Sequence, residues 1–200
     1  MFVVTGASGT GKTTLVKEAL RVVPDLGFSV SCTTRAPRVG EVDGRDYHFT
    51  SRPRFDEMVA DHAFLEWAEV YGNCYGTPRA PVEAALSAGR SILLEIDAQG
   101  AEQVCTAMPE AISIFVLPPS VSALEARLRG RASDSEAIIQ RRVREARLQL
   151  NCCEGFDFLV VNDDLESAHD QFQAVLTAAL LSGRRHRTLV SKFVDNEDEI

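Results

Sequence analysis

Residues 6–13 read Gly6-Ala7-Ser8-Gly9-Thr10-Gly11-Lys12-Thr13 and satisfy the pattern G-x-x-x-x-G-K-[ST]. The run follows the apolar residues Phe2–Val4, expected as a strand, and leads into a helical pattern that begins with Thr14 and Leu15. Glycines let the backbone curl so that successive N–H groups face phosphate oxygens, and the helix N-terminus adds a favourable dipole. A simple turn would not need a lysine and a hydroxyl in register between strand and helix. The run therefore predicts a site for the phosphates of a nucleoside triphosphate.

Two side chains of this loop are expected to have separate tasks. Lys12 would reach the β- and γ-phosphates as a point charge, and the Thr13 hydroxyl would ligate Mg²⁺. The predicted triphosphate-binding residues are Gly6, Ala7, Ser8, Gly9, Thr10, Gly11, Lys12, Thr13 and Thr14. The loop alone does not identify an acceptor, because it would equally serve a GTPase, an ATPase motor or many small-molecule kinases.

Beyond the loop, short apolar runs alternate with helical patterns. The runs are continuous, as expected of parallel strands covered on both faces: Phe2–Val4, Ile92–Ile96, Ile112–Leu117 and Phe158–Val161. Apolar residues recur near a 3.6-residue period in Leu15–Val23, Val82–Ala88, Gln103–Met108, Val121–Leu128 and Leu165–Leu181. This order predicts an α/β fold with a doubly wound parallel sheet of the P-loop NTPase type.

Two arginine-bearing segments interrupt the alternation. The first, about residues 31–77, mixes turn signals with strand-like pieces at Tyr47–Phe49 and Leu65–Val70, which predicts a small, partly antiparallel insert. The second, about residues 127–150, contains Ser133-x-x-Glu136, a capping box that would open a charged helix and form a helical lid. With 200 residues and 45% hydrophobic residues, we expect a single domain over residues 1–200. Its core would comprise about 1–30, 78–126 and 151–192.

Charge and cysteine content narrow the class of protein. A net charge of −8 argues against a general nucleic-acid binder, which needs a basic surface to neutralise phosphates. The chain has five cysteines without a C-x-x-C pair, no apolar run of membrane length and no signal peptide. We therefore expect a reduced, cytoplasmic protein with no nucleic-acid or membrane partner, and leave a homo-oligomer open. Cys152 and Cys153 could be a redox pair or metal ligands, but filler at a helix end fits better.

The acceptor is indicated by residues 31–47, which read SCTTRAPRVGEVDGRDY. The run TTRAPRVGE, with Tyr47 twelve residues after Arg35, resembles the GMP-binding signature of guanylate kinases. The blocks FLEWAEVYGNCYGT (64–77), LLEIDAQGA (93–101), RGRASDSEAIIQRR (129–142) and FDFLVVNDD (156–164) keep that family's order. The resemblance extends from Phe2 to about Lys192. It implies phosphoryl transfer from ATP to GMP, and to dGMP, with Mg²⁺ as cofactor.

The residues themselves agree with this resemblance. A nucleoside monophosphate offers a dianion, which suits Arg35 and Arg38 as forked donors and Tyr47 as a hydroxyl donor. Two arginines so placed could equally be surface charges. Guanine presents N1–H and N2–H₂ donors beside an O6 acceptor, so a selective pocket should combine a carboxylate with a hydroxyl, which Glu66 and Thr77 can supply. For Glu66 the alternative is an exposed strand carboxylate.

The resemblance implies further contacts. Glu66 would accept from the guanine edge, Ser31 and Thr77 would supply hydroxyl contacts, and Tyr75 would help to hold the phosphate. Asn162 resembles a position on the adenine side of the ATP site. The predicted GMP-binding residues are thus Ser31, Arg35, Arg38, Tyr47, Glu66, Tyr75, Thr77 and Asp97.

Glu95 and Asp97 come at the carboxyl end of the strand Ile92–Ile96, where open parallel sheets place their ligands. Alternation points both side chains to the same side, and an ion pair with Arg35 or Lys12 could satisfy one of them. The resemblance places Asp97 beside the acceptor nucleotide. Glu95 is the candidate partner of Thr13 in the magnesium site.

The lid contributes the last predicted residues. By resemblance, Arg131 and Arg142 would meet the ATP phosphates and act with Lys12 as the catalytic residues. Transfer should be direct and in line, because this transition state needs positioning and charge neutralisation rather than a general base. Ala132 stands where the family usually has glycine, which would stiffen the lid.

Two alternatives share parts of this pattern. A non-catalytic scaffold module of the guanylate kinase type would keep the fold but typically lacks an intact phosphate loop. A kinase for another phosphorylated small molecule, such as a ribose bisphosphate, would share the loop and lid. It would not need the set Arg35, Arg38, Tyr47, Glu66 and Thr77.

Overall fold

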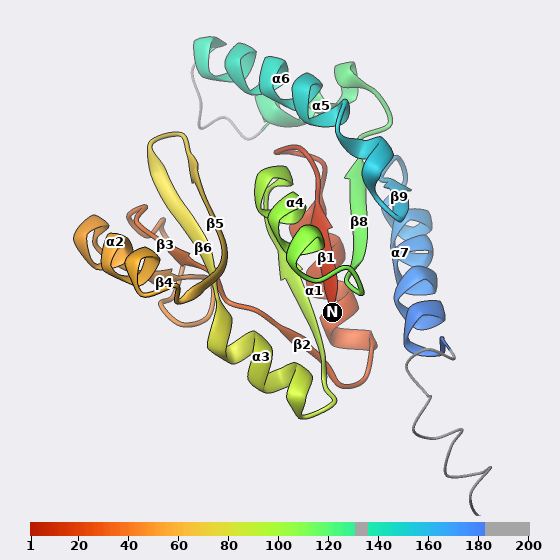
Figure 1. Cartoon of the computed structure of the whole chain (residues 1–200). Coiled ribbons are helices and arrows are strands. Elements are labelled where there is room, and N and C mark those ends of the chain that lie inside the picture. Colours follow the sequence, from red (N-terminus) through yellow and green to blue (C-terminus); the bar gives the residue numbers. More distant parts are fainter. Residues whose placement is uncertain (131–135, 183–200) are drawn as a thin grey trace, which may run out of the picture.

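The computed structural model describes residues 1–130 and 136–182, and its centre is a five-stranded parallel sheet. The strands are β1 (Phe2–Thr5), β2 (Leu26–Phe28), β7 (Ser91–Glu95), β8 (Ile112–Leu117) and β9 (Phe158–Val161). Their order is β2-β7-β1-β8-β9, so β1 lies in the middle with a parallel neighbour on each side (Figure 1). The loop that follows β1 therefore lies at the sheet edge where parallel sheets place ligands.

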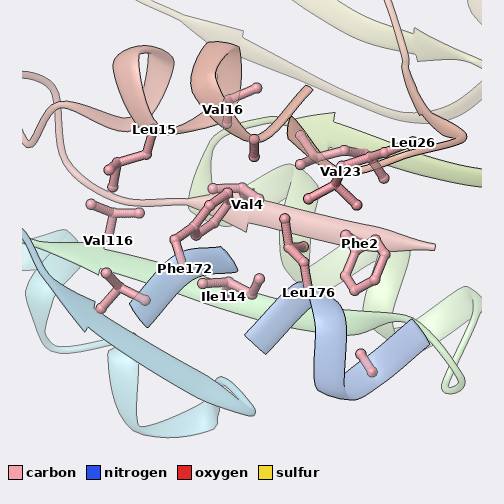
Figure 2. Packing of buried hydrophobic residues seen from close by; sticks show 14 of the residues in the cluster. Phe2, Val4, Leu15, Val16, Val23, Leu26, Ile114, Val116, Phe172 and Leu176 are labelled. Carbon is pink, nitrogen blue, oxygen red and sulfur yellow. The ribbon is translucent and has the colours of Figure 1, made fainter. Parts of the chain in front are cut away.

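Helices cover both faces of this sheet. On one face lie α1 (Lys12–Val22) and α7 (Leu165–Leu180), and on the other α3 (Arg79–Ser87) and α4 (Ala98–Ala107). Figure 2 shows the core of the first face, which includes Phe2, Val4, Leu15, Val16, Phe172 and Leu176. Val3, between two residues of that core, packs on the opposite face with Val82 and Val104. Burial on alternate faces explains why Phe2, Val3 and Val4 are apolar without interruption.

A second sheet lies to one side of the first (Figure 1). It contains β3 (Cys32–Thr33), β4 (His48–Phe49), β5 (Phe64–Val70) and β6 (Asn73–Pro78) in the order β4-β3-β6-β5. β3 is parallel to β4 and antiparallel to β6, which is antiparallel to β5. A small core of Cys32, Phe55, Phe64 and Cys74 joins the sheet to α2 (Arg52–Ala60).

Two helices lie across the end of the main sheet at which the phosphate loop lies (Figure 1). These are α5 (Val121–Gly130) and α6 (Glu136–Leu150), followed by the 3-10 helix η1 (Cys153–Gly155). Ala7 of the loop is completely buried in one cluster with Leu124, Leu128, Ile139 and Val143. Helix α6, which carries Arg142, and helix α5 are thus packed directly on the loop.

The structure confirms the predicted fold class: a parallel α/β sheet with a partly antiparallel second sheet. Several boundaries differ. The helix expected over Gln103–Met108 begins at Ala98, because the Asp97 side chain accepts from the Gly100 N–H and caps it. Helix α2 was not expected in the insert, although Ser51 caps it and Pro53 stands in its first turn. Ser133 of the predicted capping box lies outside the described residues.

The expectation that Phe158–Val161 is covered on both faces is wrong. β9 is the edge strand of the sheet, and Phe158, Leu159 and Val161 are 39%, 47% and 44% exposed, whereas Val160 is buried in the core. All five cysteines are free, with Cys152 exposed and Cys153 half-buried. Over residues 1–130 and 136–182, no helix is long and apolar enough to cross a membrane, and no three His, Cys, Asp or Glu residues gather into a metal site.

Candidate active site

The phosphate loop joins the end of β1 to the start of α1. Gly6, Gly9 and Gly11 have φ of 144°, 93° and 92°, a region that side chains with a Cβ rarely adopt. Gly11 is the N-cap of α1, so the positive end of the helix dipole is directed into the loop. The Lys12 ammonium donates to the carbonyl oxygens of Gly6 and, at 3.1 Å, of Ala7. Helix dipole and ammonium together place positive charge where the loop would hold an anion.

Neighbouring segments hold the loop in this shape. A Cβ on Gly6 would lie 2.3 Å from the carbonyl oxygen of Val116 in β8, and one on Gly11 would lie 2.2 Å from Asn162 Nδ2. Asn162 is buried, and its Nδ2 donates to the Thr10 carbonyl oxygen at 2.7 Å. Asn162 thus braces the loop itself. Its expected contact with adenine remains a prediction.

The predicted magnesium ligands Thr13 and Glu95 lie side by side. The Thr13 hydroxyl donates to Glu95 Oε1 at 2.7 Å, which links the first turn of α1 to the last residue of β7. A hydroxyl and a carboxylate are hard oxygen ligands, and Mg²⁺ is commonly held by one or two such groups together with substrate phosphates and water. The pair fits a magnesium site beside the phosphate loop.

Arg35, Tyr47 and Tyr75 gather on the second sheet. The Arg35 guanidinium carbon lies 5.4 Å from the centre of the Tyr47 ring, and the Tyr47 and Tyr75 ring centres are 6.0 Å apart. Arg35 Nη2 donates to both carboxylate oxygens of Glu41, at 2.8 and 3.0 Å. The ion pair considered between Arg35 and Glu95 or Asp97 is therefore replaced by one with Glu41, a residue six positions along the same loop.

Glu95, the partner of Thr13, influences Tyr47 of this group through its charge. Burial raises the pKa of Tyr47, and the negative charge of Glu95 raises it further. Glu95 thus lies within electrostatic reach of Tyr47 while its carboxylate is bonded to Thr13. The charge of the carboxylate bonded to Thr13 therefore reaches the Tyr47 hydroxyl.

Glu66 occupies a buried pocket between the second sheet and α4. Only 4% of the residue is exposed, and its Oε1 accepts from the Thr77 hydroxyl at 2.6 Å. The two residues are direct partners in the β5–β6 pairing, next to a register shift between Phe64 and Glu66. Burial raises the pKa of Glu66 to about 7, the Thr77 hydrogen bond lowers it, and the charge of Asp97 raises it. The alternative of an exposed strand carboxylate is wrong, because the side chain is enclosed.

The remaining predicted residues are less closely gathered. Ser31 is half-buried and its carbonyl oxygen accepts from the His48 N–H at 2.9 Å, while Arg38 is exposed and its N–H donates to Glu41 Oε2 at 2.7 Å. Arg142 lies on α6, where its charge acts on Tyr71 at the β5–β6 turn. Arg131 lies outside the described residues.

A cavity of about 910 Å³ separates α6 from α4 and the β5–β6 hairpin. Asp97, at the start of α4, is one of its lining residues, and Tyr71 and Arg141 are two others. The Arg141 guanidinium carbon lies 5.1 Å from the centre of the Tyr71 ring. The insert and the lid helix therefore touch at the hairpin while a cavity beside Asp97 lies between them.

Sequence reasoning missed three residues of this site. Glu41 binds Arg35, Gly100 lies against Glu66, and Gln103 bonds the backbone of Trp67 in β5. For Glu41 a signal was present, since it closes the arginine-bearing loop. For Gly100 the signal was its position: aspartate is a common N-cap residue, so a glycine three residues after Asp97 would lie in the first turn of a helix, where glycine is unfavourable.

Comparison with known proteins agrees with this geometry. A family model described as guanylate kinase matches residues 1–179. The guanylate kinase of Carboxydothermus hydrogenoformans is 49% identical over 92% of this chain and 91% of its own, and that of Neisseria gonorrhoeae is 47% identical over 98% and 96%.

Solved structures agree as well. The crystal structure of guanylate kinase from Anaplasma phagocytophilum superposes with a TM-score of 0.78 at 34% identity, covering 92% of this chain and 88% of that one. A shikimate kinase from Bacteroides thetaiotaomicron, at 14% identity and a TM-score of 0.51 over 88% and 97% of the two chains, shares the fold. The phosphate loop, the buried Glu66–Thr77 pair and these relatives together show that the chain belongs to the guanylate kinase family.

Proposed function

We propose that this chain transfers the γ-phosphoryl group of ATP to GMP, giving ADP and GDP, and that it also accepts dGMP. A phosphate oxygen of GMP attacks the γ-phosphorus, and the bond from that phosphorus to the oxygen bridging it to the β-phosphorus breaks. The observation that carries the proposal is the enclosed carboxylate of Glu66 beside the Thr77 hydroxyl, 2.6 Å from oxygen to oxygen. The carboxylate matches the N1–H and N2–H₂ donors of the guanine edge, and the Thr77 hydroxyl, which donates its one proton to Glu66 here, would reach O6 by turning that proton toward the base.

On the donor side, the phosphate loop would hold ATP. Its backbone N–H groups and the start of α1 would bind the phosphates, and Lys12 would neutralise charge on the β- and γ-phosphates. Thr13 and Glu95 would hold Mg²⁺, which when bound neutralises charge that develops on the phosphate oxygens. Asn162 would keep the loop in its binding shape through Thr10 and line the adenine side.

On the acceptor side, one group of residues would bind the phosphate of the nucleotide and another group would bind its base. Arg35, Arg38, Tyr47 and Tyr75 would bind the phosphate of GMP, and Ser31, Glu66, Thr77 and Asp97 would surround the base. Glu41 would orient Arg35, because it binds Nη2 while Nη1 donates to the Ala36 carbonyl oxygen at 2.7 Å, and the guanidinium carbon is held 5.4 Å from the centre of the Tyr47 ring. The GMP phosphate would then be directed toward Lys12, whose charge it would share with the phosphates of ATP.

The lid would complete the site. Arg142 on α6, together with Arg131, would approach the transferring group and stabilise charge that spreads over its oxygens. Closing the cavity between α6 and the insert would exclude water that could hydrolyse ATP. Because the reaction needs positioning and charge neutralisation, no residue is assigned as a general base.

A single assay tests the proposal. The purified chain is incubated with Mg·ATP and, separately, with GMP, dGMP, AMP, CMP and UMP, and ADP release is measured. We expect release with GMP and dGMP and little with the others; absence of GMP-dependent ADP would contradict the proposal and favour a scaffold module. A ribose bisphosphate is added as one further acceptor; ADP release with it and not with GMP would favour a kinase for another phosphorylated small molecule.

A companion variant tests the base pocket. Glu66→Ala removes the acceptor for guanine N1–H and N2–H₂, so it should lower kcat/KM for GMP while leaving that for AMP in place. Sites that hydrogen-bond a substrate reject analogues by about 10⁴-fold, so a large part of the GMP preference should vanish. An unchanged ratio of GMP to AMP would remove Glu66 from the base pocket.

A further inference from the structure

Gly100 lies against the carboxylate of Glu66, from a different segment of the chain. A Cβ built on Gly100 would be 2.4 Å from Glu66 Oε2 and 2.9 Å from its carboxyl carbon. The third nearest atom is Asp97 Oδ1, at 3.3 Å. Two of the three closest atoms thus belong to the side chain that we assign to guanine recognition.

Backbone conformation does not explain a glycine at this position. Gly100 is the third residue of α4, and it is absent from the glycines with positive φ. Alanine is the better residue inside a helix, because glycine has more conformational freedom to lose on folding. The reason for glycine must therefore be space.

The neighbours of Gly100 prevent α4 from moving away. The Gly100 N–H donates to Asp97 Oδ1 at 2.8 Å, which caps the start of the helix. Gln103, one turn further, forms two hydrogen bonds with the backbone of Trp67: its Nε2 donates to the carbonyl oxygen at 2.9 Å, and its Oε1 accepts from the N–H at 3.4 Å. Trp67 directly follows Glu66 on the edge strand β5. The helix is therefore held against the strand that carries the carboxylate.

An added methyl group would displace the carboxylate rather than the fold. Glu66 Oε2 is the end of a flexible side chain, whereas α4 is fixed by its cap and by Gln103. The other oxygen, Oε1, is bonded to Thr77, so a shift of the carboxylate would also disturb that pair. Guanine needs two acceptor oxygens in one plane, and a rotated or withdrawn carboxylate would no longer offer them.

We infer that Gly100 is a specificity-determining positioning residue: its missing side chain leaves the space in which Glu66 holds the guanine-reading carboxylate. The inference rests on the proposed function, since it names what sets the base preference of that site. Gly100 acts through Glu66 and has no assigned contact with the nucleotide.

The test is Gly100→Ala, with kcat/KM measured for GMP and for AMP. We expect kcat/KM for GMP to fall at least tenfold through a raised KM, with the value for AMP unchanged, so that the preference falls by the same factor. The thermal unfolding midpoint should fall only slightly, because the helix preference of alanine offsets part of the crowding against Glu66. Gly155→Ala is the matched control, since a Cβ there meets no atom within 4 Å; it should leave both substrates unaffected.

A double-mutant cycle shows whether the effect passes through Glu66. In the Glu66→Asp background the shorter side chain vacates the space beside Gly100. Adding Gly100→Ala to this variant should therefore change its kcat/KM for GMP less than threefold. An equal loss in both backgrounds, or an unchanged GMP preference in Gly100→Ala alone, would overturn the inference. Should Gly100→Ala not fold, recovery of folding in the double variant would support it and no recovery would overturn it. Wild-type protein inactive on GMP would instead refute the proposed function.

Discussion

In the proposed site, the phosphate loop would bind through backbone groups that its neighbours hold in place, whereas the base pocket would depend on side chains from separate segments. The loop is eight consecutive residues, and its three glycines pack against β8, α5 and Asn162. In the pocket, Glu66 comes from β5, Thr77 from β6 and Gly100 from α4. A short local motif can therefore specify phosphate binding, while choice of the base requires that two sheets and a helix be correctly assembled.

The strongest test of this contrast is Lys12→Ala on the donor side. Removal of one transition-state donor typically costs about 10² to 10³ in kcat, and we expect a loss of at least ~10² with every acceptor alike. Lys17→Ala, an exposed lysine on the same helix, is the control and should keep its rate. A loss confined to GMP would mean that Lys12 serves the acceptor site and would break the division between the two regions.

Asn162→Ala tests whether the loop is held by its surroundings. The change removes the hydrogen bond to the Thr10 carbonyl oxygen and leaves that buried acceptor unpaired. We expect a loss of about 1 to 3 kcal/mol in the free energy of unfolding, together with a raised KM for ATP and an unchanged preference for GMP over AMP. Denaturant unfolding and steady-state kinetics measure these. A normal KM for ATP would show that the loop keeps its shape without this brace.

The contrast between a local motif and a pocket assembled from separate segments also explains how much of the structure could be predicted from the sequence. The loop, the helices and the parallel strands follow from local spacing, and residues such as Glu66 and Tyr47 were found through a specific signature. Short elements were missed: β2 and β3 have three and two residues, too few for a period to show. Asp97 was taken for a ligand and not for a cap, so the start of α4 was misplaced, and with it the packing of Gly100 on Glu66.

The pH dependence of GMP use should distinguish the pocket from the loop. The pKa of Glu66 is raised to about 7 by burial, and only its ionised form can accept from both guanine donors. With that pKa, kcat/KM for GMP should fall about tenfold from pH 8 to pH 6. The phosphate of GMP titrates near pH ~6 as well. Glu66→Gln cannot ionise, so the difference between its pH profile and that of the wild type gives the part of the pH dependence that Glu66 causes. If kcat/KM for GMP fell equally from pH 8 to pH 6 in this variant, the assignment would be contradicted.

The same carboxyl group affects stability in a defined direction. Because its pKa is higher in the folded chain than in the unfolded one, its contribution is fully present below pH 4.5 and is lost as the pH rises through about 7. The free energy of unfolding of the wild type should therefore fall relative to Glu66→Gln between pH 5 and pH 8. An ionised carboxylate in this pocket is retained at a cost to stability, which is expected of a group that serves recognition.

The smallest effect is expected on the outer surface of the insert. Arg52 forms ion pairs with Asp56 at 2.9 Å and Glu69 at 3.0 Å, and all three side chains are about half exposed. Exposed pairs typically contribute less than about 1 kcal/mol, so Arg52→Ala should change the free energy of unfolding by no more than that and leave kcat/KM for GMP intact.

Phe55→Ala, in the small core of the same sheet, is the contrasting variant. Its ring is fully buried and stacks on Phe64 with centres 4.5 Å apart, and removing it should cost about 3 to 5 kcal/mol. If Arg52→Ala proved as damaging as Phe55→Ala, the second sheet would be held by its surface charges rather than by its small core. The position of Glu66 would then depend on ionic strength, and the GMP preference should decline in high salt while ATP binding by the loop would not.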